Sequence, residues 1–288
     1  MLNIANEILA KIVVLFDKAF WQNICISLSM FLLGWFVGFI SRNVYLFAKL
    51  YNSRLFLTRK KLILIWNDHD VNLSHNINGA LKTRGPGFKY KEMKSPDFIL
   101  RYPLSPQIIH MVILIVSDVT KLSDEENRRD KIQEALLNYV RKGGTLFGTH
   151  DLIYRRCRNV KLEEAYGCKI TNFKRVSHPI DVTLNTSNHP LIKDLPQKFK
   201  LDDGELCWGN WGRGSEILIR TENKVCNNNN NASDYIPILV VRRIAQKGTL
   251  IWLNSADKGE KIAGSLDGPQ SEIIQILENA IKYSNEIK

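Results

Sequence analysis

The sequence predicts an α/β domain built on a parallel sheet with helices on both faces. Two apolar stretches of strand length support this prediction: Met111–Val116, which has no polar residue, and the shorter Thr145–Phe147. An uninterrupted apolar run is typical of a strand that is covered by helices on both sides. Because an amphipathic helix is predicted between the two stretches, they form a strand–helix–strand unit, which leads to parallel pairing.

The predicted helix between these strands begins near Ser123 and ends near Gly143. Ser123 and Glu126 have the spacing of a capping box, in which each side chain bonds to the backbone at the other residue. Gly143 suits the left-handed conformation that closes many helices. The apolar residues between them recur at the i, i+3, i+4, i+7 spacing of an amphipathic helix: Ile132, Ala135, Leu136 and Tyr139.

The end of the second strand is the predicted functional centre. There the chain continues as Gly148-Thr-His150-Asp151, which predicts an abrupt, exposed turn. Open parallel sheets bind ligands beyond the carboxyl ends of their strands. We therefore expect His150 to be a general acid–base catalyst, a metal ligand or a hydrogen-bond donor to a sugar hydroxyl, with Asp151 contributing to ligand binding. The purely structural alternative is that His150 satisfies backbone groups of the turn.

Composition and charge indicate a globular protein whose basic residues favour a membrane surface. The chain has 288 residues, of which 44% are hydrophobic and 24% charged, as in ordinary globular proteins. Its formal net charge is +11, but residues 42–61 contain six basic and no acidic side chains. Because the excess is largely local, it favours a membrane surface over nucleic acid as the partner. The five cysteines show no CxxC spacing, so neither a disulfide framework nor a zinc ribbon is indicated, and a reducing compartment is expected.

The N-terminal part predicts a single-pass membrane anchor. Residues 1–18 form an amphipathic segment, and residues 19–41 contain no charged side chain and are long enough to cross a bilayer. A cleaved signal peptide would carry its basic residues before the apolar run, whereas here they follow it in residues 42–61. The positive-inside rule places the N-terminus outside the cell membrane and the C-terminal domain in the cytoplasm. Residues 42–61 are then a basic juxtamembrane stalk in contact with anionic lipid.

Residues 62–288 form the predicted cytoplasmic domain. Its first strand ends at Trp66, so Asp68 and His69 in the following loop are candidate ligand-binding residues. Arg155 lies in a basic cluster that could hold an anion, the alternative being a solvated charged surface. Residues 84–107 are rich in proline and glycine and are expected to lack long regular elements. Further strands and a last helix are predicted at Pro179–Leu184, Glu216–Arg220, Ile236–Val241, Thr249–Leu253 and from Pro269 onward.

Five segments, in order along the chain, together resemble the ThuA family of trehalose-utilisation proteins: Leu64–His69, Tyr139–His150, His189–Leu195, Asp202–Glu205 and Lys247–Leu253. The resemblance runs through most of the predicted domain, and the family shares the class I glutamine amidotransferase-like fold. It implies a flavodoxin-like sheet with a site at the strand ends, where Asp203 and Glu205 join His150, Asp68 and His69. The chain departs from the family after Leu253, where Asn254-Ser-Ala-Asp stands in place of a common Gly-His.

The residues at the predicted turn exclude one reaction of this fold. Glutamine amidotransferases use a cysteine in the turn after this strand to form a thioester. The corresponding turn here is Gly148-Thr-His150-Asp151, and the next cysteine is Cys157. An imidazole cannot form that thioester, so cysteine-dependent glutaminase activity is not expected.

Three functions of different classes follow. The first is a membrane-anchored domain that binds or acts on a sugar or a related small polar metabolite, with His150 as the acid–base group and the acidic residues positioning the substrate or a divalent metal. The second is a catalytically inactive sensor or interaction module that recognises an anionic or nucleotide-like ligand, with a protein partner or a second copy of the chain. The third is a docking surface at the membrane. No particular cofactor is indicated.

Overall fold

The computed structural model describes residues 22, 24–39, 61–67, 88–93, 95–101, 104–116, 121–176, 179–201, 205–226, 233–255 and 271–286. The chain divides into two compact units, Met1–Arg59 and Lys60–Lys288. The predicted amphipathic segment 1–18 lies outside the described residues, as do all of the basic stalk except Lys61 and the candidate residues Asp68, His69 and Asp203.

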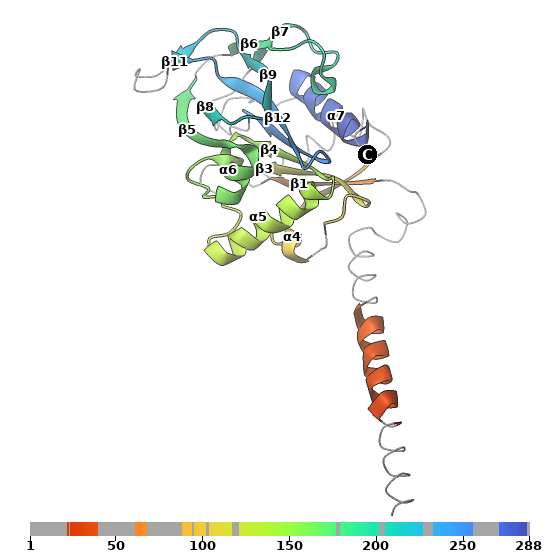
Figure 1. The fold of residues 1–288 in the computed structure, drawn as a ribbon. Coiled ribbons are helices and arrows are strands. Elements are labelled where there is room, and N and C mark those ends of the chain that lie inside the picture. Colours follow the sequence, from red (N-terminus) through yellow and green to blue (C-terminus); the bar gives the residue numbers. More distant parts are fainter. Residues whose placement is uncertain are drawn as a thin grey trace, which may run out of the picture. The chain divides into compact units, whose positions relative to one another are not determined.

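The described part of the first unit is a helix over residues 24–39 (Figure 1). It contains no charged residue, and its large apolar side chains are exposed: Phe31 is 71% and Trp35 63% accessible. Among the residues that the structure describes, no helix combines the length and the apolar character needed to cross a membrane.

The second unit is a mixed α/β domain around one nine-stranded sheet, in the order β2-β1-β3-β4-β13-β12-β9-β6-β7. The first five strands in this order run parallel to one another, and from β13 to β7 each neighbouring pair is antiparallel. The prediction of a parallel sheet is therefore correct for one half and wrong for the other. The strands are β1 (Lys61–Asn67), β2 (Phe88–Met93), β3 (Ile109–Ile115), β4 (Thr145–Thr149), β6 (Ile180–Leu184), β7 (Lys198–Leu201), β9 (Ser215–Thr221), β12 (Pro237–Ile244) and β13 (Gly248–Leu253).

The antiparallel half has a physical cause in how its strands are joined. Only three residues, Ala245–Lys247, connect β12 to β13, and Ala245 and Gln246 both have positive φ. So short a connection forms a hairpin, because a parallel pair needs a crossover of a dozen or more residues. The sequence predicts the two strands but not this turn between them.

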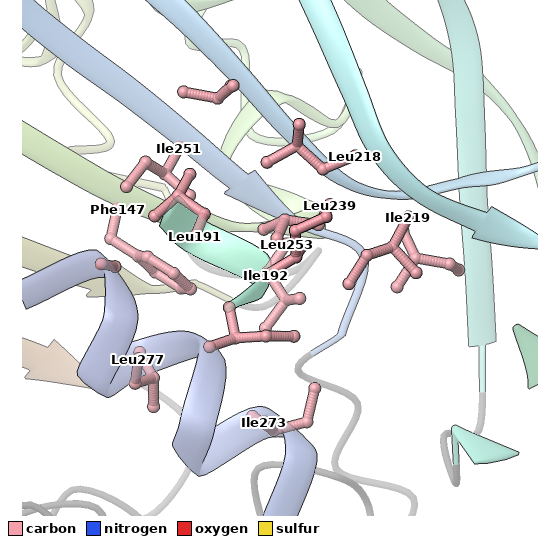
Figure 2. Close-up of a cluster of buried hydrophobic side chains, with 14 of the residues drawn as sticks. Phe147, Leu191, Ile192, Leu218, Ile219, Leu239, Ile251, Leu253, Ile273 and Leu277 are labelled. Carbon is pink, nitrogen blue, oxygen red and sulfur yellow. The ribbon is translucent and has the colours of Figure 1, made fainter. Parts of the chain in front are cut away.

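Two helices cover opposite faces of the parallel half, α5 (Glu126–Arg141) and α7 (Ser271–Glu286) (Figure 1). In β1 and β3, alternate residues such as Ile63 and Ile113 share one buried cluster with Ile273 of α7. Their neighbours along each strand are buried too but do not belong to that cluster, as expected for side chains that point to the α5 face. Figure 2 shows the α7 side of this core, where α7 meets β4, β9, β12, β13 and the short 3₁₀ turn η2 (Pro190–Ile192).

The start of α5 differs from the prediction. The helix begins at Glu126, and its N-cap is Glu125, which makes no side-chain capping bond. Ser123 instead offers its carbonyl oxygen to the guanidinium of Arg129 at 2.8 Å. The capping box is therefore absent, because a buried arginine folds back over the residues before the helix. The other end is as predicted, with Gly143 at φ 99°.

The described part of residues 84–107 holds short elements, in agreement with the prediction that long ones are absent. They include β2, which pairs with β1, and the one-turn helix α4 (Phe98–Arg101). Two small ribbons flank the main sheet: β5 (Cys168–Arg175) with β8 (Glu205–Trp211), and β10 (Val225–Cys226) with β11 (Ser233–Asp234). The ribbon of β5 and β8 follows helix α6 (Val160–Tyr166), and it supplies residues to the site.

Candidate functional site

The site is built where β4 ends and a 3₁₀ turn, η1 (His150–Ile153), begins. Thr149 accepts a hydrogen bond on Oγ1 from the backbone N–H of Val116, 3.1 Å away, which ties the ends of β3 and β4 together. The indole N–H of Trp252 donates to the carbonyl oxygen of His150 at 3.4 Å. The backbone at position 150 is therefore held by both neighbouring strands.

The predicted exposed turn is in fact buried. His150 is 2% and Asp151 4% accessible. One cause is that Leu152 and Ile153 of the same turn are fully covered and draw the chain inward. Another is Gly148, where an added Cβ would lie 2.3 Å from the Leu152 side chain, so the turn packs directly onto the strand.

Four side chains meet at this point: His150, Asp151, Glu205 and Cys207, hereafter the His150 cluster. Nδ1 of His150 lies 3.4 Å from Sγ of Cys207 and 3.1 Å from Oδ1 of Asp151. The thiol of Cys207 in turn lies 3.4 Å from Oε1 of Glu205, to which it donates. The cluster thus brings together an imidazole, a thiol and two carboxyl groups from η1 and β8.

The two nitrogens of His150 have different surroundings. Nδ1 faces Asp151 and Cys207. Nε2 is buried and has no hydrogen-bond partner among the residues that the structure describes. Oδ1 of Asp151 is likewise buried and, although in ion-pair contact with Nδ1, accepts no hydrogen bond from the described part of the chain. Buried polar atoms are almost always paired in folded proteins, so these two atoms indicate a place for another group.

The cluster perturbs the titration of its members. Burial by itself lowers the pKa of His150, but the Asp151 carboxylate and Cys207 act in the opposite direction and hold that pKa well above its usual value. Burial raises the pKa of the Cys207 thiol to about 12, against the opposing effect of His150. Without another cation nearby, Cys207 is therefore a thiol rather than a nucleophilic thiolate.

Asn254, directly after β13, fixes β8 beside the cluster. Its Oδ1 accepts from the backbone N–H of Cys207 at 3.0 Å, and its Nδ2 donates to the carbonyl oxygens of Cys207 at 2.7 Å and Pro237 at 2.8 Å. The residue that departs from the ThuA pattern is thus a buried clamp between β8, β12 and β13. On the other side of Glu205, Nε of the exposed Arg175 lies 3.9 Å from Oε2.

The predicted site residues are only partly brought together. His150, Asp151 and Glu205 belong to the cluster, whereas Arg155 is exposed and lies outside it, with its guanidinium 5.8 Å from the centre of the Tyr154 ring. Asp68, His69 and Asp203 cannot be placed, because they are among the residues that the structure does not describe. The strand before Asp68, β1, ends at the same edge of the sheet as β4.

Cys207 is the site residue that sequence reasoning missed. The signal was its spacing from Glu205, because residues two apart in a strand point to the same face. The sequence analysis includes Asp202–Glu205 in the resemblance but predicts no strand from Glu205 onward, so it does not place Cys207 on the same face as Glu205. The resemblance places the reactive cysteine of this fold in the turn after β4, where this chain has none. Cys207 instead reaches His150 from another strand, β8.

The comparisons with known proteins identify the fold. No protein-family model and no curated protein sequence matches the chain. A protein from Bacteroides uniformis ATCC 8492 described as ThuA-like superposes with a TM-score of 0.55 at 16% identity, covering 78% of this chain and 91% of its own. A second protein described as ThuA-like, from Parabacteroides merdae ATCC 43184, has a TM-score of 0.57 at 14% identity, covering 79% and 90%.

A cytoplasmic protein from Salmonella typhimurium LT2 superposes with a TM-score of 0.56 at 11% identity, covering 77% of this chain and 98% of its own. The domain therefore has the fold of ThuA-like proteins, as the five sequence segments predicted. At these identities the likeness concerns the fold and leaves the function to be argued from the site.

Proposed function

We propose that this chain is a membrane-anchored domain that binds, or acts on, a sugar or a related small polar metabolite at the His150 cluster. One observation carries the proposal: a buried histidine at the carboxyl end of a parallel strand has one ring nitrogen held by its neighbours and the other without a hydrogen-bond partner among the described residues. Ligands of open α/β sheets bind at this edge.

The chemistry of the cluster suits a hydroxyl-rich ligand. Contacts to Nδ1 fix the orientation of the His150 ring, so Nε2 can donate to, or accept from, a hydroxyl group. Asp151 stabilises the charged form of the ring, which supports transfer of a proton to a ligand oxygen. Because Cys207 sits in the sheet ribbon as a protonated thiol and not in the turn after β4, the cluster does not favour glutaminase chemistry.

The anchor and its orientation form the second part of the proposal. The helix over residues 24–39 is uncharged and exposes apolar side chains, which supports membrane contact of the predicted segment 19–41. We infer that residues 42–61 lie against anionic lipid and that the domain faces the cytoplasm, because the basic residues follow the apolar segment. A C-terminal reporter fusion tests this, and activity of a periplasmic reporter would contradict it.

One observation favours the second candidate, an inactive module for an anionic ligand. Arg155, Arg156 and Arg158 are all exposed, directly after η1. The guanidinium groups of Arg155 and Arg156 each lie 5.8 Å from the ring centre of Tyr154. Exposed guanidinium groups are typical ligands of a phosphate or a carboxylate, whether on a small molecule or on a protein partner.

A thermal-shift screen of the purified full chain in detergent tests the main proposal, with sugars including trehalose, polyols and sugar phosphates as probes. A ligand at a hundred times its dissociation constant stabilises the folded state by about 2.7 kcal/mol. We expect a sugar or polyol to raise the melting temperature of the wild type and of a His189→Gln control, but not of His150→Gln.

The same screen separates the candidates. A shift produced only by sugar phosphates and lost in Arg155→Ala would favour the anionic module. A shift that persists in His150→Gln would contradict the assignment of the site to this histidine. Product formation with the shifting ligand then distinguishes an enzyme from a binding domain.

A further inference from the structure

We infer that the His150 cluster is a binding site for a thiolate-preferring divalent cation such as Zn²⁺, with His150, Cys207 and Glu205 as protein ligands. These three residues each offer one ligand atom, and the three atoms lie within 4.8 Å of one another. The inference goes beyond the proposed function and does not depend on a sugar as the ligand.

The distances fit a tetrahedral ion. Zn²⁺ binds cysteine sulfur at about 2.3 Å and histidine nitrogen at about 2.0–2.1 Å, so a sulfur and a nitrogen on one ion stand about 3.5 Å apart. Nδ1 of His150 is 3.4 Å from Sγ of Cys207, and Sγ is 3.4 Å from Oε1 of Glu205. These are edges of such a tetrahedron, and small shifts of side chains would admit the ion.

Asp151 supplies an independent indication. Its Oδ1 is buried, lies 3.1 Å from Nδ1 of His150 and accepts no hydrogen bond from the described residues. A carboxylate oxygen next to the same ring nitrogen is placed either to complete the coordination or to bond a water on the metal. The cluster therefore holds one imidazole and three groups that become anionic, and a divalent cation would offset two of these three negative charges.

The surroundings have the features of a supported metal site. Asn254 holds the backbone of Cys207 on both its N–H and its carbonyl side, and Nε of Arg175 lies 3.9 Å from the far oxygen of Glu205. Partners of this kind orient metal ligands and tune their affinity. Binding would release two protons to solvent, one from Nδ1 of His150 and one from Sγ of Cys207, because the metal takes a neutral imidazole and a thiolate as ligands. With Nδ1 on the metal, Nε2 of His150 carries the ring proton and can donate a hydrogen bond to a bound small molecule.

The test is metal analysis of the full chain purified in detergent. After loading with Zn²⁺ and dialysis, we expect about one equivalent by mass spectrometry in the wild type and in Cys168→Ser, a control at another buried cysteine. Cys207→Ala should retain less than a tenth of that amount, and Glu205→Gln should bind at least tenfold more weakly. Co²⁺ should give a sulfur-to-metal charge-transfer band in the wild type that is absent in Cys207→Ala.

The outcomes separate this inference from the proposed function. A wild type that retains no Zn²⁺ and shows no Co²⁺ band, or a Cys207→Ala variant that retains the full equivalent, overturns the metal site. Retention of sugar-induced stabilisation in metal-free protein would leave the proposed function standing. Cys207→Ala removes one sulfur atom, so we expect this variant to fold. Its circular dichroism spectrum, compared with that of the wild type, checks this. Glu205→Gln, which preserves size, provides a second, independent loss of affinity.

Discussion

The two halves of the nine-stranded sheet bury their residues in different ways. Every residue of the central parallel strands β3, β4 and β13 is buried, whereas β6 and β7 at the antiparallel edge, like β2 at the other edge, alternate or are only half-buried. Helices α5 and α7 cover both faces of the parallel half. Strands covered on both faces need apolar side chains throughout, and strands with one open face do not. The comparison indicates that the central parallel strands contribute most to stability, while β6 and β7 at the antiparallel edge tolerate change.

The largest expected effect is a cavity in the parallel half. Ile113 in β3 is fully buried, so Ile113→Ala should lower the free energy of unfolding by about 4 kcal/mol. Ile180→Ala in β6, at a half-buried position, should cost about 1 kcal/mol. Urea unfolding followed by tryptophan fluorescence measures both. Equal losses would contradict the difference between the halves.

A glycine in the parallel half provides the next test. A Cβ at Gly248, the first residue of β13, would stand 1.8 Å from the carbonyl oxygen of Val140 in α5. Because that atom belongs to the backbone, Gly248→Ala should cost about 3 kcal/mol. Gly214, in the turn before β9, has φ 89° and no neighbour within 4 Å of an added Cβ, so Gly214→Ala should cost about 1 kcal/mol. A smaller loss at Gly248 than at Gly214 in thermal unfolding would refute this ordering.

Asn254 joins the halves, and its removal should have an intermediate effect. Asn254→Ala deletes three buried side-chain hydrogen bonds to the backbone of β8 and β12, so we expect a loss of about 2 kcal/mol. Cys207 should also react faster with a thiol reagent, because β8 is no longer held against the site. Unchanged reactivity, measured against that of Cys168, would show that the clamp does not fix Cys207.

The smallest expected effect is a pH dependence in the antiparallel half. Burial lowers the pKa of His189, and Nδ1 of this residue accepts a hydrogen bond from the backbone N–H of Leu191. As the pH falls, His189 is therefore protonated in the unfolded chain before it is protonated in the folded chain. The contribution of neutral His189 to folding stability is present above pH 6.5 and declines below it. We expect a loss of less than about 1 kcal/mol, comparable to that of a helix cap. His189→Asn can cap without titrating and should remove the decline between pH 7.5 and 5.5.

The parallel half could be predicted from the sequence because apolar runs and an amphipathic helix identify it directly. Met111–Val116 and Thr145–Phe147 correspond to β3 and β4. The antiparallel half was misread because its direction is set by turns such as Ala245–Lys247, which lack the usual glycine or asparagine signal. The location of His150 at a strand end was predictable for the same reason as the strand itself.

The composition of the site was harder to predict than its position. Whether His150 is exposed depends on Leu152, Ile153 and the ribbon of β5 and β8, which are tertiary features. The neighbourhood of Cys207 and His150 joins residues 57 apart in sequence, and no local pattern links them. The role of Asn254 was likewise invisible, since a polar residue after a strand is ordinarily a loop residue.

The clamp by Asn254 has a consequence for how this site could be re-engineered. All its contacts to residue 207 are to the peptide groups, so they are indifferent to the side chain carried there. These hydrogen bonds from Asn254 can therefore position β8 independently of the side chain at residue 207. Because Cys207 is fully buried, side chains of similar size, such as serine, are the substitutions at position 207 that can vary the chemistry opposite His150 without overpacking the core.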